Sequence, residues 1–159
     1  LNHFFGVIGE IILKHRGIVD KYLGDGLLGI FGAPASSGYD ADNAVAAALE
    51  MQAAMKGINH HVRTLVDQPL TMGISIHTGE ALIGNIGFDK KMDYTVIGDS
   101  VNVVFKLQSL CKSWPDNILI SEKACSSAQS SLNAEEIGVF EIEPTVAAQK
   151  IYRLLGIRK

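Results

Sequence analysis

The spacing of apolar residues divides the first part of the chain into a helix and a β-hairpin. Residues 1–16 place apolar side chains at intervals of three and four, which predicts an amphipathic helix ending at Gly17. Residues 18–23 and 27–31 are short β-forming runs separated by Gly24-Asp25-Gly26. This arrangement predicts a hairpin that turns at the two glycines.

A second helix is predicted after a loop at residues 32–38. We expect either Asp40 or Asp42 to cap its first turn. Its apolar face is rich in alanine, which indicates close packing against a sheet. The residues of this face are Ala44, Ala47, Ala48, Met51, Ala54 and Met55.

The second half of the chain predicts more strands and two more helices. Residues 70–77 and 81–86 are expected to pair with each other around a turn at 78–80. A helix is expected to follow from Ser100. The other expected elements are strands at 94–97, 118–120, 139–142 and 150–155, and a small helix opened by residues 121–123. Because helices alternate with hairpins rather than with single parallel strands, we predict a mixed-sheet α+β fold.

Composition and charge narrow the class of protein. The chain has 159 residues, 47% of them hydrophobic, with 14 basic and 17 acidic side chains and a net charge of -3. This length fits one domain with its own core. Without a basic excess we expect no nucleic-acid partner, and without a long apolar run we expect no membrane contact by this segment.

The two cysteines, Cys111 and Cys125, match neither a disulfide framework nor a zinc site. We expect them to be small buried groups in a reducing compartment, and therefore a cytoplasmic location, although a parent protein could be membrane-attached. The chain starts at Leu1 and its apolar pattern begins at once. We therefore expect residues 1–159 to be a single domain truncated at its N-terminus and fused to regulatory domains in a longer parent.

Asp25 is the first candidate for chemistry, because a carboxylate between two turn glycines can approach a hard cation such as magnesium. The alternative is an ordinary Asp-Gly turn. Lys21 precedes it by four residues, or about 13 Å along a strand, so one small ligand would struggle to touch both within one chain. If both are functional, we expect two protomers to share each site. Otherwise Lys21 is a solvated strand lysine.

The second candidate group lies in three glycine-rich runs, at residues 73–80, 84–87 and 93–102. Thr95 on a strand and Asn102 early on the next helix are placed to face one cleft. Lys106, one turn beyond Asn102, would share its face and meet a phosphate oxygen. The alternative is a plain amphipathic helix with a polar stripe. For His77, structural packing is favoured over catalysis.

The runs at 18–34 and 73–107 together resemble the catalytic domain of class III nucleotidyl cyclases, the adenylate and guanylate cyclases. The resemblance implies a ferredoxin-like α+β sandwich, in which helices pack on a mixed, mainly antiparallel sheet. It also implies that an N-terminal strand of the family's sheet is missing here, together with the first of two metal-binding aspartates.

The resemblance also implies a role for each candidate residue. Asp25 matches the second metal-binding aspartate, Lys21 and Thr95 match the pair that reads the purine, Asn102 matches the residue that positions the ribose, and Lys106 stands where the family has a transition-state arginine. The implied reaction converts ATP to cyclic AMP and pyrophosphate, with Mg²⁺ or Mn²⁺, at the interface of a head-to-tail homodimer.

Lysine at position 106 and a divergent segment at residues 141–150 depart from the family pattern. In that segment Lys150 is the only candidate for binding the terminal phosphates, and it is expected in the closing strand instead. Two alternatives therefore remain. The first is a weak or inactive cyclase-homology module that binds nucleotide or dimerises, and the second is a guanylate cyclase, which Lys21 disfavours.

Overall fold

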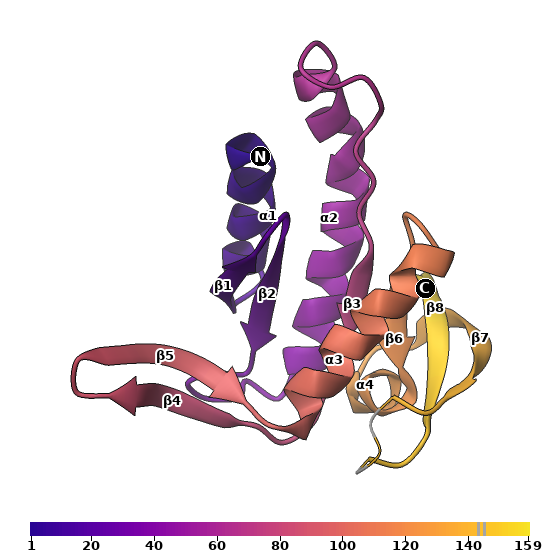
Figure 1. Ribbon diagram of the computed structural model, residues 1–159. Coiled ribbons are helices and arrows are strands. Elements are labelled where there is room, and N and C mark those ends of the chain that lie inside the picture. The colour runs from indigo at the N-terminus through magenta and orange to yellow at the C-terminus, as the bar shows by residue number, and fades with distance from the viewer. Residues whose placement is uncertain (143, 145) are drawn as a thin grey trace.

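A computed structural model describes residues 1–159 except Glu143 and Thr145. Four α-helices, a short 3₁₀ helix (η1) and eight strands follow one another along the described chain (Figure 1). Their bounds are α1 Asn2–Lys14, β1 Gly17–Leu23, β2 Gly26–Phe31, α2 Asp40–Val62, β3 Ile74–Ile76, β4 Leu82–Phe88, β5 Lys91–Ile97, α3 Asp99–Leu110, η1 Cys111–Ser113, β6 Ile118–Ser121, α4 Glu122–Ser127, β7 Leu132–Phe140 and β8 Gln149–Ile157.

The α1 helix and the β1–β2 hairpin form where the sequence predicts them. Ile8, Ile11 and Ile12 are buried against α2 and the hairpin. Gly17 does not end the helix, because the left-handed residue after α1 is Arg16, with φ 67°. Gly17 begins β1, and a Cβ there would lie 2.7 Å from the Phe31 ring. Its role is therefore close packing rather than helix capping.

The α2 helix has the predicted apolar face but a different N-cap residue. Its predicted face packs in the core as expected, with Ala44 and Ala54 partly buried and the other four residues buried. The prediction that Asp40 or Asp42 caps the helix is wrong, because Tyr39 is the N-cap residue and makes no side-chain cap. Asp40 accepts hydrogen bonds from the preceding serine-rich loop, and Asp42 accepts from the backbone N–H groups of Gln129 and Ser130. Both carboxylates therefore accept hydrogen bonds from loop residues instead of capping the first turn of α2.

The predicted pairing of residues 70–77 with 81–86 is wrong. β3 pairs in parallel with β6, whereas β4 pairs antiparallel with β5. The reason is burial, since β6 is buried along its whole length and Ile74 and Ile76 of β3 pack with it over α2. The described strands form a four-stranded mixed sheet in the order β3-β6-β8-β7 and two separate hairpins, β1-β2 and β4-β5.

Two further boundaries differ from the prediction. α3 begins at Asp99 behind an N-cap at Gly98, and the Ser100 hydroxyl donates to the Glu80 carbonyl. β7 begins at residue 132, seven residues before the predicted strand. The prediction missed the first part of β7 because this part contains polar residues that face solvent and so lacks a continuous apolar run. Ser121 caps α4 as expected, by accepting a hydrogen bond from the Ala124 N–H.

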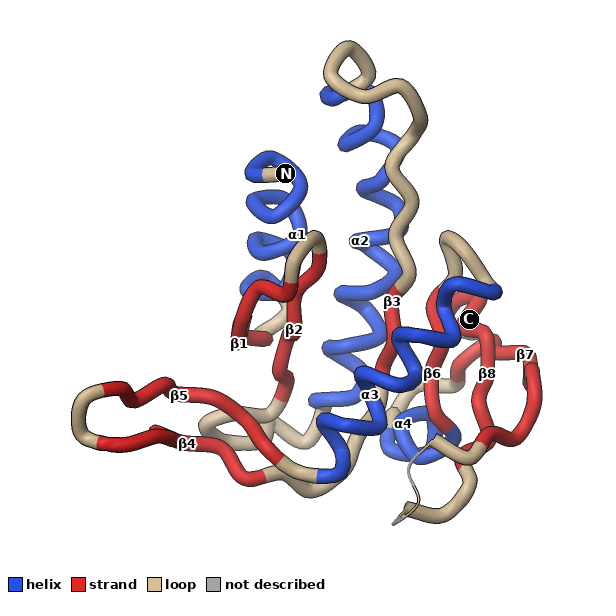
Figure 2. The backbone as a smooth tube through the Cα atoms, viewed as in Figure 1, coloured by secondary structure: helices blue, strands red, loops and turns tan. Residues whose placement is uncertain are grey.

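The elements confirm an α+β fold of a mixed, mainly antiparallel sheet with helices packed on it. The α1 and α2 helices stand side by side and pack against β1–β2 and β3, whereas the β4–β5 hairpin extends away from the remaining elements as an arm (Figure 2). Among the described residues, no helix combines the length and apolarity needed to cross a bilayer.

Candidate functional site

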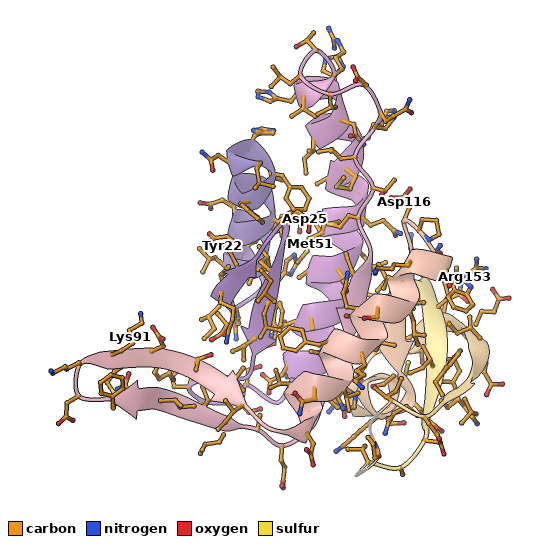
Figure 3. All side chains as sticks on the ribbon, viewed as in Figure 1. Tyr22, Asp25, Met51, Lys91, Asp116 and Arg153 are labelled. Carbon is orange, nitrogen blue, oxygen red and sulfur yellow. The ribbon has the colours of Figure 1, made fainter. Side chains whose placement is uncertain are left out.

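Lys21 and Asp25 lie on the β1–β2 hairpin, as predicted, and both are exposed. Lys21 belongs to β1, and Asp25 occupies the turn beside Gly24, whose φ of 63° explains the glycine. A Cβ at Gly24 would meet nothing within 4 Å, so the turn is open around it. Figure 3 shows Asp25 at the tip of the hairpin, away from the β4–β5 arm.

Lys21 and Thr95 are brought together by a residue that the motif analysis did not single out, Asp20. The Thr95 hydroxyl donates to Asp20 Oδ2 at 3.0 Å, and the Lys21 Nζ lies 3.5 Å from the same oxygen. The Asp20 side chain is 1% exposed, whereas the Lys21 side chain is 42% exposed. One buried carboxylate thus joins two residues that are 74 positions apart and that were predicted to act as a pair.

Asn102 and Lys106 share one face of α3, which begins two residues after β5 ends. Both are exposed, while Val103 and Leu107, the residues that follow each of them, are buried in the core. The spacing of four residues places the two polar side chains one turn apart. The helix therefore carries Asn102 and Lys106 on one exposed face, as the sequence predicts.

Asp25 is the residue that the sequence proposes for binding a divalent cation. Its carboxylate is of the oxygen-donor type that Mg²⁺ prefers, and it sits in an open glycine turn. Within the described residues, no three His, Cys, Asp or Glu side chains cluster as a metal site. Because Mg²⁺ is commonly held by one or two carboxylates together with substrate phosphates, a single exposed aspartate fits a cation that arrives with a nucleotide.

Lys150 lies in the closing strand β8, as expected. Its Nζ is 3.6 Å from Glu136 Oε1. The charges of Glu122, Tyr152 and Glu136 raise the pKa of this lysine, so its ammonium group has acidic neighbours inside the chain. The divergent segment that precedes it includes Glu143 and Thr145, which lie outside the described residues.

His77 has a structural role, which is the favoured interpretation of the sequence. Its Nδ1 lies 2.7 Å from the Ser121 hydroxyl, and Ser121 is fully buried at the start of α4. The Ser121 oxygen accepts from the Ala124 N–H, so its own proton is available to the His77 ring. The contact ties the end of β3 to α4.

Protonation of His77 is expected to destabilise the domain at low pH. Burial, with a smaller effect of the Lys123 charge, lowers the pKa of His77 from 6.5 to about 4. Between these values the unfolded state binds a proton that the folded state does not, so the free energy of unfolding falls as pH drops from about 6.5 to about 4. Urea titrations of the native protein and of His77→Gln check this. The native protein should lose more stability over that range, and parallel curves would contradict the expectation.

Both cysteines are unpaired thiols in the structure. Cys111 is buried in a core cluster with Leu107, Leu119 and Ile151, and Cys125 is half-buried. Burial raises the pKa of each thiol to about 11, with a contribution from Glu122 at Cys125. The thiols therefore stay protonated at neutral pH, as expected of packing groups rather than nucleophiles or metal ligands.

Two surface hollows lie elsewhere in the described part of the chain. One is lined by residues of α1 and α2, and the other by Glu80, Ala81, Leu82, Ile97 and Gly98. Neither includes a predicted site residue.

Comparison with known proteins identifies the family. The family described as adenylate and guanylate cyclase catalytic domain matches residues 1–156. An adenylate cyclase of Anabaena cylindrica is 34% identical over 126 residues, which is 77% of this chain and 24% of that protein. The chain spans about a quarter of the length of the curated relatives it matches.

Two solved structures share the fold over nearly the whole chain. The guanylyl cyclase Cya2 superposes with a TM-score of 0.89 at 35% identity, over 100% of this chain and 80% of that one. The adenylyl cyclase CyaB from P. aeruginosa superposes with a TM-score of 0.85 at 30% identity, over 99% and 81% of the two chains. With its fold, its motif runs and these relatives in agreement, the chain belongs to the family of adenylate and guanylate cyclase catalytic domains.

Proposed function

We propose that this domain converts ATP to cyclic AMP and pyrophosphate as a homodimer with Mg²⁺ or Mn²⁺, in the cytoplasm. The observation that carries the proposal is the meeting of Lys21 and Thr95 on the buried carboxylate of Asp20. A donor and an acceptor held side by side suit the hydrogen-bonding edge of adenine. The low cysteine content of the chain, two residues in 159, supports the cytoplasmic location.

In the proposed reaction each of the five candidate site residues has one role. Lys21 and Thr95 hold the base, and Asn102 orients the ribose so that its 3′ oxygen faces the α-phosphorus. That oxygen gives its proton to solvent water and bonds to phosphorus, while the oxygen that bridges the α- and β-phosphates leaves with its electron pair as part of pyrophosphate. The Lys106 ammonium stabilises the negative charge that grows on the phosphate. Asp25 would hold a divalent ion, which would acidify the 3′ hydroxyl and neutralise phosphate charge.

The exposed arm supports the homodimer. The β4–β5 hairpin extends away from the other elements (Figure 1) and carries five large apolar side chains that are 46% to 65% exposed. These residues are Leu82, Phe88, Met92, Tyr94 and Ile97. An apolar surface of this kind is typical of an interaction site. If Lys21 and Asp25 both act in one site, a partner copy would supply its own Asp25, as expected from the spacing of the two residues.

The proposal is tested by measuring cyclic nucleotide formation by the full-length protein that carries this domain. Purified protein is incubated with Mn²⁺ and either ATP or GTP, and its oligomeric state is measured by sedimentation. Cyclic AMP from a dimer is the expected result. An excess of cyclic GMP, formed from GTP, would favour the guanylate cyclase alternative, which the similarity to the guanylyl cyclase Cya2 supports. No product from folded, dimeric protein would leave a nucleotide-binding or regulatory module.

Replacing Lys106 by alanine is expected to lower the turnover number about 10²-fold, because one charge opposite the transition state is lost. The helix should remain folded, since the side chain is exposed. The measurement is kcat for cyclic AMP together with thermal unfolding. Lys112, an exposed lysine of η1, supplies the matched control as Lys112→Ala. Equal activities of the two variants would show that Lys106 does not touch the phosphate.

A further inference from the structure

Asp20 is a buried charged group to which neither the sequence motifs nor the comparisons assign a task. Its side chain is 1% exposed, and its Oδ2 atom has two partners, the Thr95 hydroxyl at 3.0 Å and the Lys21 ammonium at 3.5 Å. A buried carboxylate is costly unless it is paired and hydrogen-bonded. Both partners are residues to which the proposed function gives contact with the purine.

The local backbone explains how neighbouring residues meet. Successive side chains of a regular strand point to opposite faces, so Asp20 and Lys21 would normally be separated. The register of β1 shifts here, because Val19 pairs with Gly29 and Lys21 pairs with the next residue, Leu28. Asp20 is therefore the extra residue of a β-bulge. A bulge re-aims side chains, and this one allows Asp20 and Lys21 to form an ion pair.

The contact also sets the direction of the hydrogen bonds. A carboxylate only accepts, so Thr95 must use its single hydroxyl proton on Asp20. The Thr95 oxygen can then only accept from a ligand. Lys21 can only donate, and its ammonium is partly exposed. The pair therefore presents one donor and one acceptor with fixed polarity.

We infer that Asp20 is a positioning residue that makes the nucleotide site selective for adenine over guanine. The inference rests on the proposed function. Adenine offers an acceptor at N1 and a donor at its 6-amino group, which match Lys21 and Thr95. Guanine offers a donor at N1 and an acceptor at O6. The Lys21 donor would then face the N1 donor, and the Thr95 acceptor would face the O6 acceptor. Unpaired buried groups of this kind disfavour the wrong base.

The test is the variant Asp20→Asn in the full-length protein. The asparagine amide keeps the shape but can donate to Thr95, which frees the threonine proton for guanine O6 and removes the charge that holds Lys21. We expect the ratio of kcat/KM for ATP to that for GTP to fall about tenfold. Asp93→Asn is the matched control, because Asp93 lies on β5 with a side chain 63% exposed, and its ratio should not change.

A purely structural role would lower both activities equally, and that result would overturn the inference. Equilibrium binding of fluorescent ATP and GTP analogues separates the inference from the proposed function. If the native protein forms no cyclic nucleotide but prefers ATP, and Asp20→Asn removes the preference, the cyclase proposal fails while the role of Asp20 stands. If the native protein forms cyclic AMP and Asp20→Asn keeps its selectivity for ATP, the cyclase proposal stands while the inferred role of Asp20 fails.

A second pair of variants covers the case in which Asp20→Asn does not fold. Thr95→Ser keeps a hydroxyl that can donate to Asp20 and accept from adenine, so ATP selectivity should be retained. Thr95→Val keeps the shape without the hydroxyl, so selectivity should fall. Equal selectivity of the two Thr95 variants would overturn the inference, because the polarity of the Thr95 hydroxyl would then have no effect on base choice.

Discussion

Cyclic nucleotide formation is expected to fall by about 10³-fold or more when Asp25 is replaced by alanine. Asp25 is the exposed carboxylate at the tip of the β1–β2 hairpin, and no cluster of three ligands elsewhere in the described residues offers a substitute. Without the carboxylate, a cation would be held by nucleotide phosphates alone. Its contribution to charge neutralisation, worth several kcal/mol, would largely be lost.

The measurement is the initial rate of cyclic AMP formation by the native protein and by Asp25→Ala over a series of Mn²⁺ concentrations. Asp67→Ala is the control, because Asp67 is an exposed aspartate in the loop that follows α2. Thermal unfolding of both variants should match that of the native protein. Undiminished activity of Asp25→Ala would remove Asp25 from the site and leave an ordinary turn, the alternative that the motif alone permits.

The largest expected loss of stability comes from Leu107→Ala on α3. Leu107 is 0% exposed and packs with Cys111, Leu119 and Ile151. Truncation removes buried methyl groups and leaves a cavity between α3 and the four-stranded sheet. We expect the free energy of unfolding to fall by about 2–5 kcal/mol.

Urea denaturation measures this difference, and Leu65→Ala is the matched control. Leu65 lies in the loop after α2 and is 78% exposed, so its truncation should change the free energy of unfolding by less than about 0.5 kcal/mol. Comparable losses in the two variants would mean that α3 does not pack as described. Leu107 is next to Lys106 in the sequence. Comparing the Leu107→Ala and Lys106→Ala variants therefore distinguishes the effect of the buried face of α3 on stability from the effect of its exposed face on activity.

Local signals predicted much of the fold. The first helix, the Gly24-Asp25-Gly26 hairpin and the alanine-rich face of α2 follow from spacing and turn chemistry within a few residues. The prediction that Ser121 caps α4 also depended only on neighbouring residues, and the structure confirms it. The prediction that Asp40 or Asp42 caps α2 was wrong because their side chains bond to other loops. The α3 helix begins one residue before the predicted Ser100, whose hydroxyl donates to the Glu80 carbonyl.

Strand pairing was the main error, and its cause is physical. An apolar run indicates that a segment is a buried strand, but it does not say which strand lies beside it. Residues 74–76 and 82–88 are close in sequence, yet β3 pairs with β6, more than 40 residues away, because the fully buried β6 needs a covered edge. Such a choice depends on packing across the whole domain.

The sequence by itself determined the fold class, the family and five candidate site residues, because these depend on residue types at short spacing. Only the tertiary structure decided that Lys21 and Thr95 meet, and that they meet on Asp20. A bulge in β1 and the approach of β5 create this contact between residues 74 positions apart. No local pattern specifies it, because side-chain direction in a bulge and the distance between two hairpins are set by the packed chain.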